Sequence, residues 1–118
     1  MDFHWPKTKD AKVDDCAGIL CQQDGALCRV SLAGRITIDS SPDLRLSLLQ
    51  HLESPACQSL TVDFYEVPYI DTSGLAVLVE VLKAARDRGK ALYLSRLRER
   101  PRYLLEATRL AHLFKEVQ

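Results

Sequence analysis

The segment Asp71-Thr72-Ser73-Gly74 places a carboxylate, two hydroxyls and a glycine directly before an apolar run of helical periodicity. A helix that begins at Thr72 or Ser73 puts the serine beside backbone N–H groups that have no partner inside the helix. The helix dipole adds partial positive charge at the same place. A phosphate group on Ser73 is therefore accommodated electrostatically, and Ser73 is the candidate for chemical modification, with Thr72 a weaker second acceptor.

Three neighbours are expected to support this serine. Asp71 precedes the helix and can cap it. Asp63 is expected at the end of the preceding strand, where its carboxylate reaches the same rim. Gly74 has no Cβ, so another protein can approach the backbone beside Ser73.

The predicted helix runs from Thr72 or Ser73 to about residue 88, with Gly89 as its C-cap. One flank, with Ala76, Val77 and Glu80, is a candidate docking surface for another protein. The alternative is that Val77 and Val81 pack under a neighbouring helix, and for the flank taken alone the pattern favours that alternative. The inward stripe of the helix is predicted to contain Leu75, Leu78, Val79, Leu82 and Ala85.

The elements that must position this segment alternate along the chain. Strands are predicted over residues 18–23, 26–33, 59–65 and 91–94, and helices from about 40 to 53, 72 to 88, 102 to 108 and 111 to 117. A hairpin followed by alternating strands and helices predicts an α/β domain, a mixed sheet of about four to five strands with about four helices mainly on one face. We expect one domain over residues 18–118, preceded by a leader over 1–17 that is either flexible or packs through Trp5.

Composition excludes several classes of function. The 16 basic and 16 acidic residues give a formal net charge of zero, so no overall basic field attracts nucleic acid. A local arginine cluster, Arg96, Arg98, Arg100 and Arg102, is diluted by Glu99 and Glu106. The start of the chain has no apolar signal segment, and the longest apolar run, 75–82, is too short to cross a bilayer. A cytosolic protein without membrane insertion is predicted.

The four cysteines are Cys16, Cys21, Cys28 and Cys57, and none of them forms a CxxC pair. Free thiols are the expected state in a cytosolic protein, and Cys28 alternates with Val30 and Leu32 as a core strand residue does. A zinc site built from Cys16, Cys21 and Cys28 matches no common ligand spacing. No metal and no other cofactor is predicted.

Residues 60–78, LTVDFYEVPYIDTSGLAVL, resemble the signature of the STAS domain found in anti-sigma-factor antagonists. That signature is an apolar strand ending in Asp, a short linker, Asp-Ser/Thr-Ser-Gly and an apolar helix. Residues 32–36 and 88–94 are similar to the family's strand-to-helix and helix-to-strand turns. The resemblance extends over roughly residues 18–117 and implies a STAS-like fold.

The resemblance implies a partner-switching mechanism. Antagonists of this family bind a serine kinase of the histidine-kinase-like fold that doubles as an anti-sigma factor, and binding frees the sigma factor. The kinase phosphorylates the serine before the glycine, here Ser73, and a metal-dependent phosphatase removes the phosphate. The site would comprise Ser73 with Asp63, Asp71, Thr72, Gly74, Ala76, Val77 and Glu80.

Two other functions remain as alternatives. The sequence of residues 71–76 also resembles that of STAS proteins that serve as cytoplasmic subunits of lipid-transport ABC systems and contact the ATPase or permease. A small serine-dependent enzyme is disfavoured because the nucleophile pattern GxSxG is absent and no feature ties His4, His51 or His112 to Ser73. The sequence leaves the oligomeric state open.

Overall fold

The computed structural model describes residues 18–117, and over this range the chain forms one five-stranded sheet in the order β1-β2-β3-β4-β5. The strands are β1 (Gly18–Asp24), β2 (Leu27–Ala33), β3 (Ser59–Glu66), β4 (Ala91–Ser95) and β5 (Lys115–Val117). The helices are α1 (Ser41–Glu53), α2 (Thr72–Asp87), α3 (Glu99–Ala107) and the short 3-10 helix η1 (Ala111–Leu113). β1 pairs antiparallel with β2 and the later pairs are parallel, so the predicted mixed sheet is confirmed.

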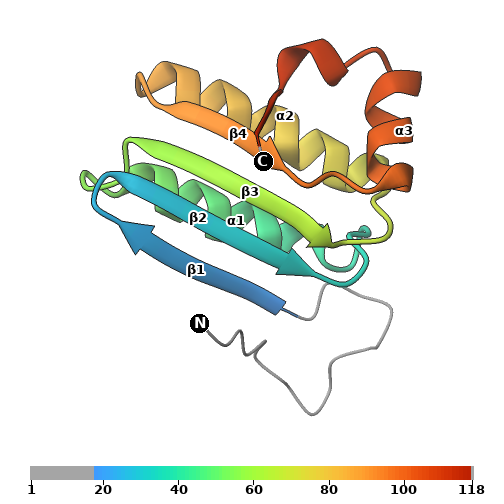
Figure 1. Ribbon diagram of the computed structural model, residues 1–118, viewed down its shortest axis with the longest axis horizontal. Helices are drawn as coiled ribbons and strands as arrows, with labels where there is room; N and C mark the ends of the chain where they lie inside the picture. Colours follow the sequence, from blue (N-terminus) through green and yellow to red (C-terminus); the bar gives the residue numbers. More distant parts are fainter. Residues whose placement is uncertain (1–17, 118) are drawn as a thin grey trace.

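The helices α1 and α2 lie behind the sheet on the same side, as Figure 1 shows. Alternate residues of each strand point toward them, since successive side chains of a strand face opposite sides. Cys28, Val30 and Leu32 of β2 are 4% exposed or less, as their alternation predicts. The fully buried side chains of the two helices and the central strands form one core, which includes Leu44, Leu48, Leu52, Val62, Phe64, Leu78, Val81 and Leu94.

The end of the chain differs from the prediction. Residues 110–117 carry apolar side chains at helical spacing, but the helix predicted over 111–117 is wrong: η1 covers three residues and β5 follows. β5 pairs with β4, Tyr93 opposite Lys115, and so supplies hydrogen bonds to a strand edge that a terminal helix would leave unpaired. The third helix begins at Glu99, three residues before the predicted start, because Pro101 is tolerated inside a first turn.

The start of α1 has a serine at the N-cap position but no side-chain cap. Ser40 occupies the N-cap position without a side-chain bond to the helix. Its hydroxyl accepts the Thr37 N–H at 2.9 Å and donates to the Arg35 carbonyl at 3.2 Å. This serine therefore shapes the loop between β2 and α1, which lies beside the start of α2. The predictions for the leader at 1–17 and for Cys16 fall outside the described residues.

Candidate functional site

Asp71 is the N-cap of α2, and one of its carboxylate oxygens organises the start of the helix. Oδ1 accepts the backbone N–H groups of Ser73 at 2.9 Å and Gly74 at 3.2 Å, and the Ser73 hydroxyl at 2.5 Å. Burial alone would raise the pKa of Asp71, but these bonds, with one from the Ile38 backbone N–H, hold the pKa below its usual value. The Ser73 hydroxyl is thus fixed by a carboxylate that stays ionised at neutral pH.

The loop between β2 and α1 braces this helix start from the side. The Asp71 N–H donates to the Ile36 carbonyl at 3.0 Å, and the Ile36 N–H donates to the Tyr69 carbonyl at 3.0 Å. Ile36 and Ile70 also form an isolated parallel bridge. The segment that carries Ser73 is therefore tied to the end of β2, and both meet at the carboxyl edge of the sheet.

Gly74 has a different role from the one predicted. It is buried, and a Cβ at this position would lie 2.6 Å from Ile36 Cγ2 and 2.7 Å from Ile70 Cγ1. The glycine is therefore required by the close packing of the chain's own residues against the helix. The surface beside Ser73 is formed instead by the exposed residues Thr72 and Ala76.

The predicted docking flank of α2 is only partly on the surface. Ala76 is exposed, but Val77 is 7% exposed and belongs to the core, so its predicted place on the docking surface is wrong. The burial of Val77 favours the alternative, since α1 packs along α2. Glu80 is half-buried and joins the two helices, accepting the Arg45 Nε–H at 2.8 and 2.9 Å.

An exposed isoleucine next to the site escaped the sequence analysis. Ile38 is 72% exposed, although its backbone N–H reaches the Asp71 carboxylate. The available signal was an isoleucine between Thr37 and Asp39, in a loop where an apolar side chain has no core to enter. We use the term α2 docking surface for five residues: Ile38, Thr72, Ser73, Ala76 and Glu80.

Asp63 does not join this surface. β3 continues to Glu66, so Asp63 lies inside the strand, and it points to the face opposite the core residues Val62 and Phe64. Its carboxylate is 2.5 Å from Arg96 Nη2 and 3.3 Å from Arg29 Nη2, and it accepts the Ser95 hydroxyl at 3.1 Å. The prediction that Asp63 reaches the rim beside Ser73 is wrong, because the strand is longer than expected and two arginines hold the carboxylate.

Burial alone would raise the pKa of Asp63, but hydrogen bonds from Arg96 and Ser95 and the charge of Arg29 hold it below its usual value. Arg96 takes a positive φ of 53°, a conformation that non-glycine residues seldom adopt. Its guanidinium lies 4.4 Å from the centre of the Tyr65 ring as well as on Asp63. These contacts fix the turn after β4, so the network around Asp63 is a structural one.

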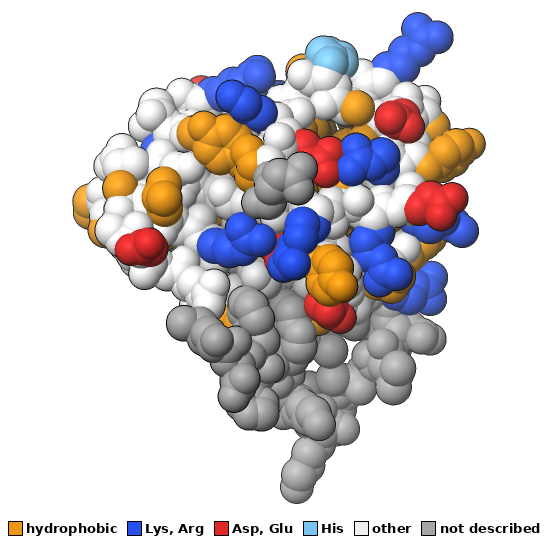
Figure 2. Space-filling model, in the orientation of Figure 1, with side chains coloured by type: hydrophobic (Ala, Val, Ile, Leu, Met, Phe, Trp, Pro, Cys, Tyr) orange, Lys and Arg blue, Asp and Glu red, His pale blue; other side chains and the backbone are white. Residues whose placement is uncertain are grey.

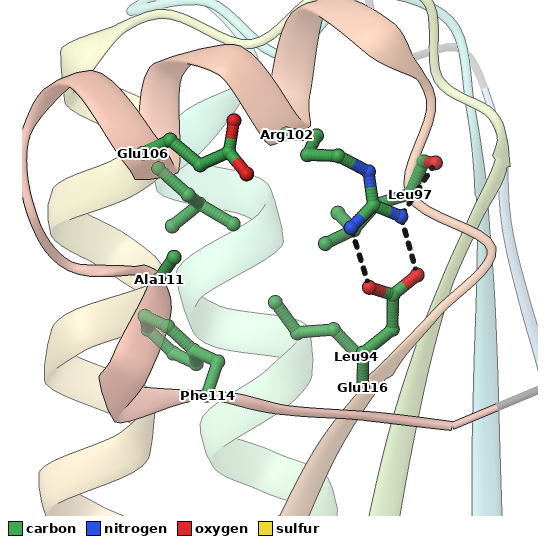
Figure 3. Close-up of a pocket in the computed structure, with 8 residues that line it drawn as sticks. Leu94, Leu97, Arg102, Glu106, Ala111, Phe114 and Glu116 are labelled. Carbon is green, nitrogen blue, oxygen red and sulfur yellow. Dashed lines mark hydrogen bonds and ion pairs between the residues drawn. The ribbon is translucent and has the colours of Figure 1, made fainter.

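A pocket of about 160 Å³ lies between β4, α3, η1 and β5, and Figure 3 shows its lining. An ion pair spans it: Arg102 donates to both carboxylate oxygens of Glu116, at 2.8 and 2.7 Å. The remaining lining residues are Leu94, Leu97, Leu105, Glu106, Ala111 and Phe114. None of the predicted site residues contributes to this pocket. Within the arginine cluster, Arg102 pairs with Glu116, whereas Arg96 pairs with Asp63.

Several other features bear on the chemistry of the described chain. The Ser73 hydroxyl bonds to Asp71 and not to a histidine; His51 Nδ1 instead bonds the Ser47 carbonyl at 2.7 Å. Cys21, Cys28 and Cys57 are free thiols. Between residues 18 and 117 there is no cluster of three or more His, Cys, Asp or Glu suited to a metal ion. Over the same range no helix is both long and apolar enough to cross a bilayer.

The sequence of this chain is similar to those of known proteins. A family model described as "Mlab, STAS domain" matches residues 19–115. The anti-sigma-B factor antagonist of Bacillus subtilis (strain 168) is 35% identical over 82 residues, which is 70% of this chain and 73% of the relative.

Two solved structures of the anti-sigma factor antagonist SpoIIAA share the fold. Its unphosphorylated form matches with a TM-score of 0.73 and 11% identity, over 86% of this chain and 89% of the other. The phosphorylated form of the Bacillus protein matches with a TM-score of 0.68 and 11% identity, over 86% and 92%. The family model, the curated relative and the five-stranded fold agree, and the chain belongs to the STAS-domain family.

Proposed function

We propose that the chain is an anti-sigma-factor antagonist that binds a serine kinase acting also as an anti-sigma factor, and that phosphorylation of Ser73 ends this binding. The observation that carries the proposal is the Ser73 hydroxyl, held by Asp71 on the first turn of α2 beside exposed Thr72 and Ala76. The name of the Bacillus subtilis relative supports the antagonist function. The existence of a phosphorylated form of SpoIIAA supports the modification.

In the proposed phosphoryl transfer the kinase uses ATP as the phosphate donor. Ser73 Oγ forms a bond to the γ-phosphorus of ATP as the bond to the β–γ bridging oxygen breaks, and ADP leaves. The hydroxyl proton, which points at Asp71 Oδ1, passes through that carboxylate to water. The chain is the substrate in this step and contributes Asp71 as the proton acceptor, and the kinase supplies the ATP-binding site.

Release of the partner follows from charge. A phosphoserine adds about 1.5 to 2 negative charges at neutral pH. Inside an interface over the α2 docking surface, these charges would lie beside ionised Asp71 and away from water. Repulsion and desolvation both oppose the bound state, so the phosphorylated chain dissociates.

The cycle is closed by a metal-dependent serine phosphatase that hydrolyses the Ser73 phosphate. The proposal assigns the chain no enzymatic activity and no cofactor, and places the cycle in the cytosol. Hydrolysis restores the hydroxyl and its bond to Asp71, and with them the binding-competent surface.

The direct test mixes the protein with kinases of this fold from the same genome and ATP, and maps phosphate by mass spectrometry. We expect one phosphate at Ser73, none in Ser73→Ala, and unchanged labelling in Thr72→Val, which keeps a side chain of similar shape at the exposed neighbouring position. Kinase binding without label at either Ser73 or Thr72 would contradict the proposed regulation.

A second candidate function is the STAS subunit of a lipid-transport ABC system, because residues 71–76 read Asp-Thr-Ser-Gly-Leu-Ala. The same α2 docking surface would then contact the transporter ATPase or permease without phosphorylation. Co-purification separates the two: a transport ATPase and permease bound equally by the parent chain and Ser73→Ala support the transporter, and a kinase supports the antagonist.

A further inference from the structure

Two arginines lie against one tyrosine at the carboxyl edge of the sheet. The guanidinium carbon of Arg35 lies 4.5 Å from the centre of the Tyr69 ring, and that of Arg100 lies 5.5 Å from it. Arg35 comes from the loop after β2 and Arg100 from the first turn of α3. Figure 2 shows several Lys and Arg side chains, interspersed with acidic and hydrophobic ones, on the face of the molecule that the sheet presents.

The charges of this pair are not neutralised within the described chain. The other arginines near the sheet face, Arg29 and Arg96, share the carboxylate of Asp63. Neither Arg35 nor Arg100 makes an ion pair with any residue between 18 and 117. Stacking on Tyr69 restricts both side chains while leaving guanidinium N–H groups to bind an anion. The arrangement is therefore a preorganised pair of cations without an internal anion.

The pair lies next to the candidate phosphorylation site. Arg35 adjoins Ile36, whose carbonyl accepts the Asp71 N–H and whose side chain packs against Gly74. Tyr69 is two residues before Asp71, and the bridge between Ile70 and Ile36 ties this segment to the loop that carries Arg35. The loop carrying Arg35 is bonded to the Asp71 carboxylate itself through the Ile38 N–H.

We propose that Arg35 and Arg100, held on Tyr69, form the receiving site for the phosphate carried by Ser73. This inference rests on the proposed function, because it needs a phosphate at Ser73. Two guanidinium groups balance a phosphate dianion, and their planar forks match phosphate oxygens bidentately. An arginine cluster opposite a phosphoserine creates new charge-assisted hydrogen bonds.

The receiving site stabilises the free form of the phosphorylated protein and therefore favours dissociation from the partner. Repulsion from Asp71 makes the phosphate unfavourable inside an interface, and the arginine pair stabilises it in the free protein. Regulation then depends on the β2–α1 loop and α3 as well as on α2.

The test uses the full chain with phosphoserine incorporated at position 73 during synthesis, so that no kinase is needed. Phosphorus NMR follows the second ionisation of the phosphate as pH is varied. We expect the midpoint in the parent to lie about one pH unit below that of the double variant Arg35→Gln/Arg100→Gln. The double variant Arg35→Lys/Arg100→Lys keeps both positive charges but cannot bind phosphate oxygens bidentately. Its midpoint is expected to lie between those of the parent and Arg35→Gln/Arg100→Gln.

The matched control is Lys83→Gln/Arg86→Gln, which removes the same charge from exposed positions at least about 15 Å along α2 from Ser73. Its midpoint should equal that of the parent. Equal midpoints in the parent and Arg35→Gln/Arg100→Gln, or an equal shift in the control, would overturn the inference. If the double variant unfolds, Arg100→Gln alone, at an exposed position, decides by the same criterion.

The two proposals fail separately. A kinase that leaves Ser73 unlabelled contradicts the proposed function and leaves the NMR result unaffected. An unshifted midpoint in a protein that a kinase does label contradicts only the receiving site.

Discussion

Two aspartates of this chain lie at the carboxyl half of the sheet and have opposite surroundings. Asp63 is 2% exposed and is held by Arg96, Arg29 and Ser95. Asp71 is half-buried, and its bonds come from backbone N–H groups and the Ser73 hydroxyl. The Asp63 carboxylate meets two cations, whereas the Asp71 carboxylate meets only dipoles. The first arrangement ties β3 to β4 and β2, and the second orients the half-buried Ser73 hydroxyl at the start of α2.

Among substitutions that compare Asp63 with Asp71, Asp63→Asn is expected to change the free energy of unfolding most. The substitution keeps the shape but removes the charge that Arg96 and Arg29 share, and it lowers the free energy of unfolding by about 3 kcal/mol. Urea denaturation measures the change. A loss smaller than that of Asp71→Ala would show that the Asp63 network does not stabilise the sheet.

The same network predicts a pH dependence. The pKa of Asp63 is lower in the folded chain than its ordinary value of 3.8, so its stabilisation is complete above that value and is lost as pH falls through the folded pKa. The gap in unfolding free energy between the parent and Asp63→Asn should therefore narrow as pH is lowered from 6 to about 3. A gap that stays constant or widens toward acid pH would contradict the assigned charge state.

Gly74→Ala tests the packing beside the serine. Alanine inside a helix is normally stabilising, but here its Cβ would meet Ile36 and Ile70 at 2.6 and 2.7 Å. We expect a loss of about 2 kcal/mol in the free energy of unfolding. Gly89→Ala is not a useful control because its φ is +66°, so an exposed α2 substitution such as Lys83→Ala serves instead. A stabilised Gly74→Ala protein would show that Ile36 does not lie against the helix start.

Asp71→Ala is expected to have the smallest effect on stability. It removes the N-cap of α2, which costs about 1 kcal/mol, because water can replace some of the lost bonds at a half-buried site. Thermal unfolding together with urea titration measures the loss. A loss as large as that of Asp63→Asn would remove the distinction between a structural and a functional carboxylate.

The elements around Ser73 were predictable because their signals are local. The alternation of β2 and the Asp-Thr-Ser-Gly start of α2 each depend on residues close together in the sequence, and the structure has these elements where they were predicted. The end of the chain was not predictable in this way, since residues 110–117 have apolar side chains at helical spacing. Pairing with the edge of β4 makes Lys115–Val117 a strand instead.

The environment of the site was predictable only in part. The Asp71 cap follows from its position before the helix, but the partners of Asp63 lie more than thirty residues away in both directions. Helical periodicity could not tell that Val77 is buried, because it gives the direction of a side chain and not how many faces of the helix are covered. The roles of the loop residues Ile36 and Ile38 were missed because only the tertiary fold brings them to the start of α2.

The most direct measurement of the central claim is the affinity of the chain for a kinase that it binds, compared among Ser73→Asp, Ser73→Asn and the parent. Asp and Asn have the same shape, so the comparison isolates charge on the α2 docking surface. We predict that Ser73→Asn binds within a few-fold of the parent and that Ser73→Asp binds at least about tenfold more weakly, an effect of the size expected when like charge is placed at an interface. Equal affinities for Ser73→Asp and Ser73→Asn would contradict the account, because negative charge at Ser73 would then not control binding.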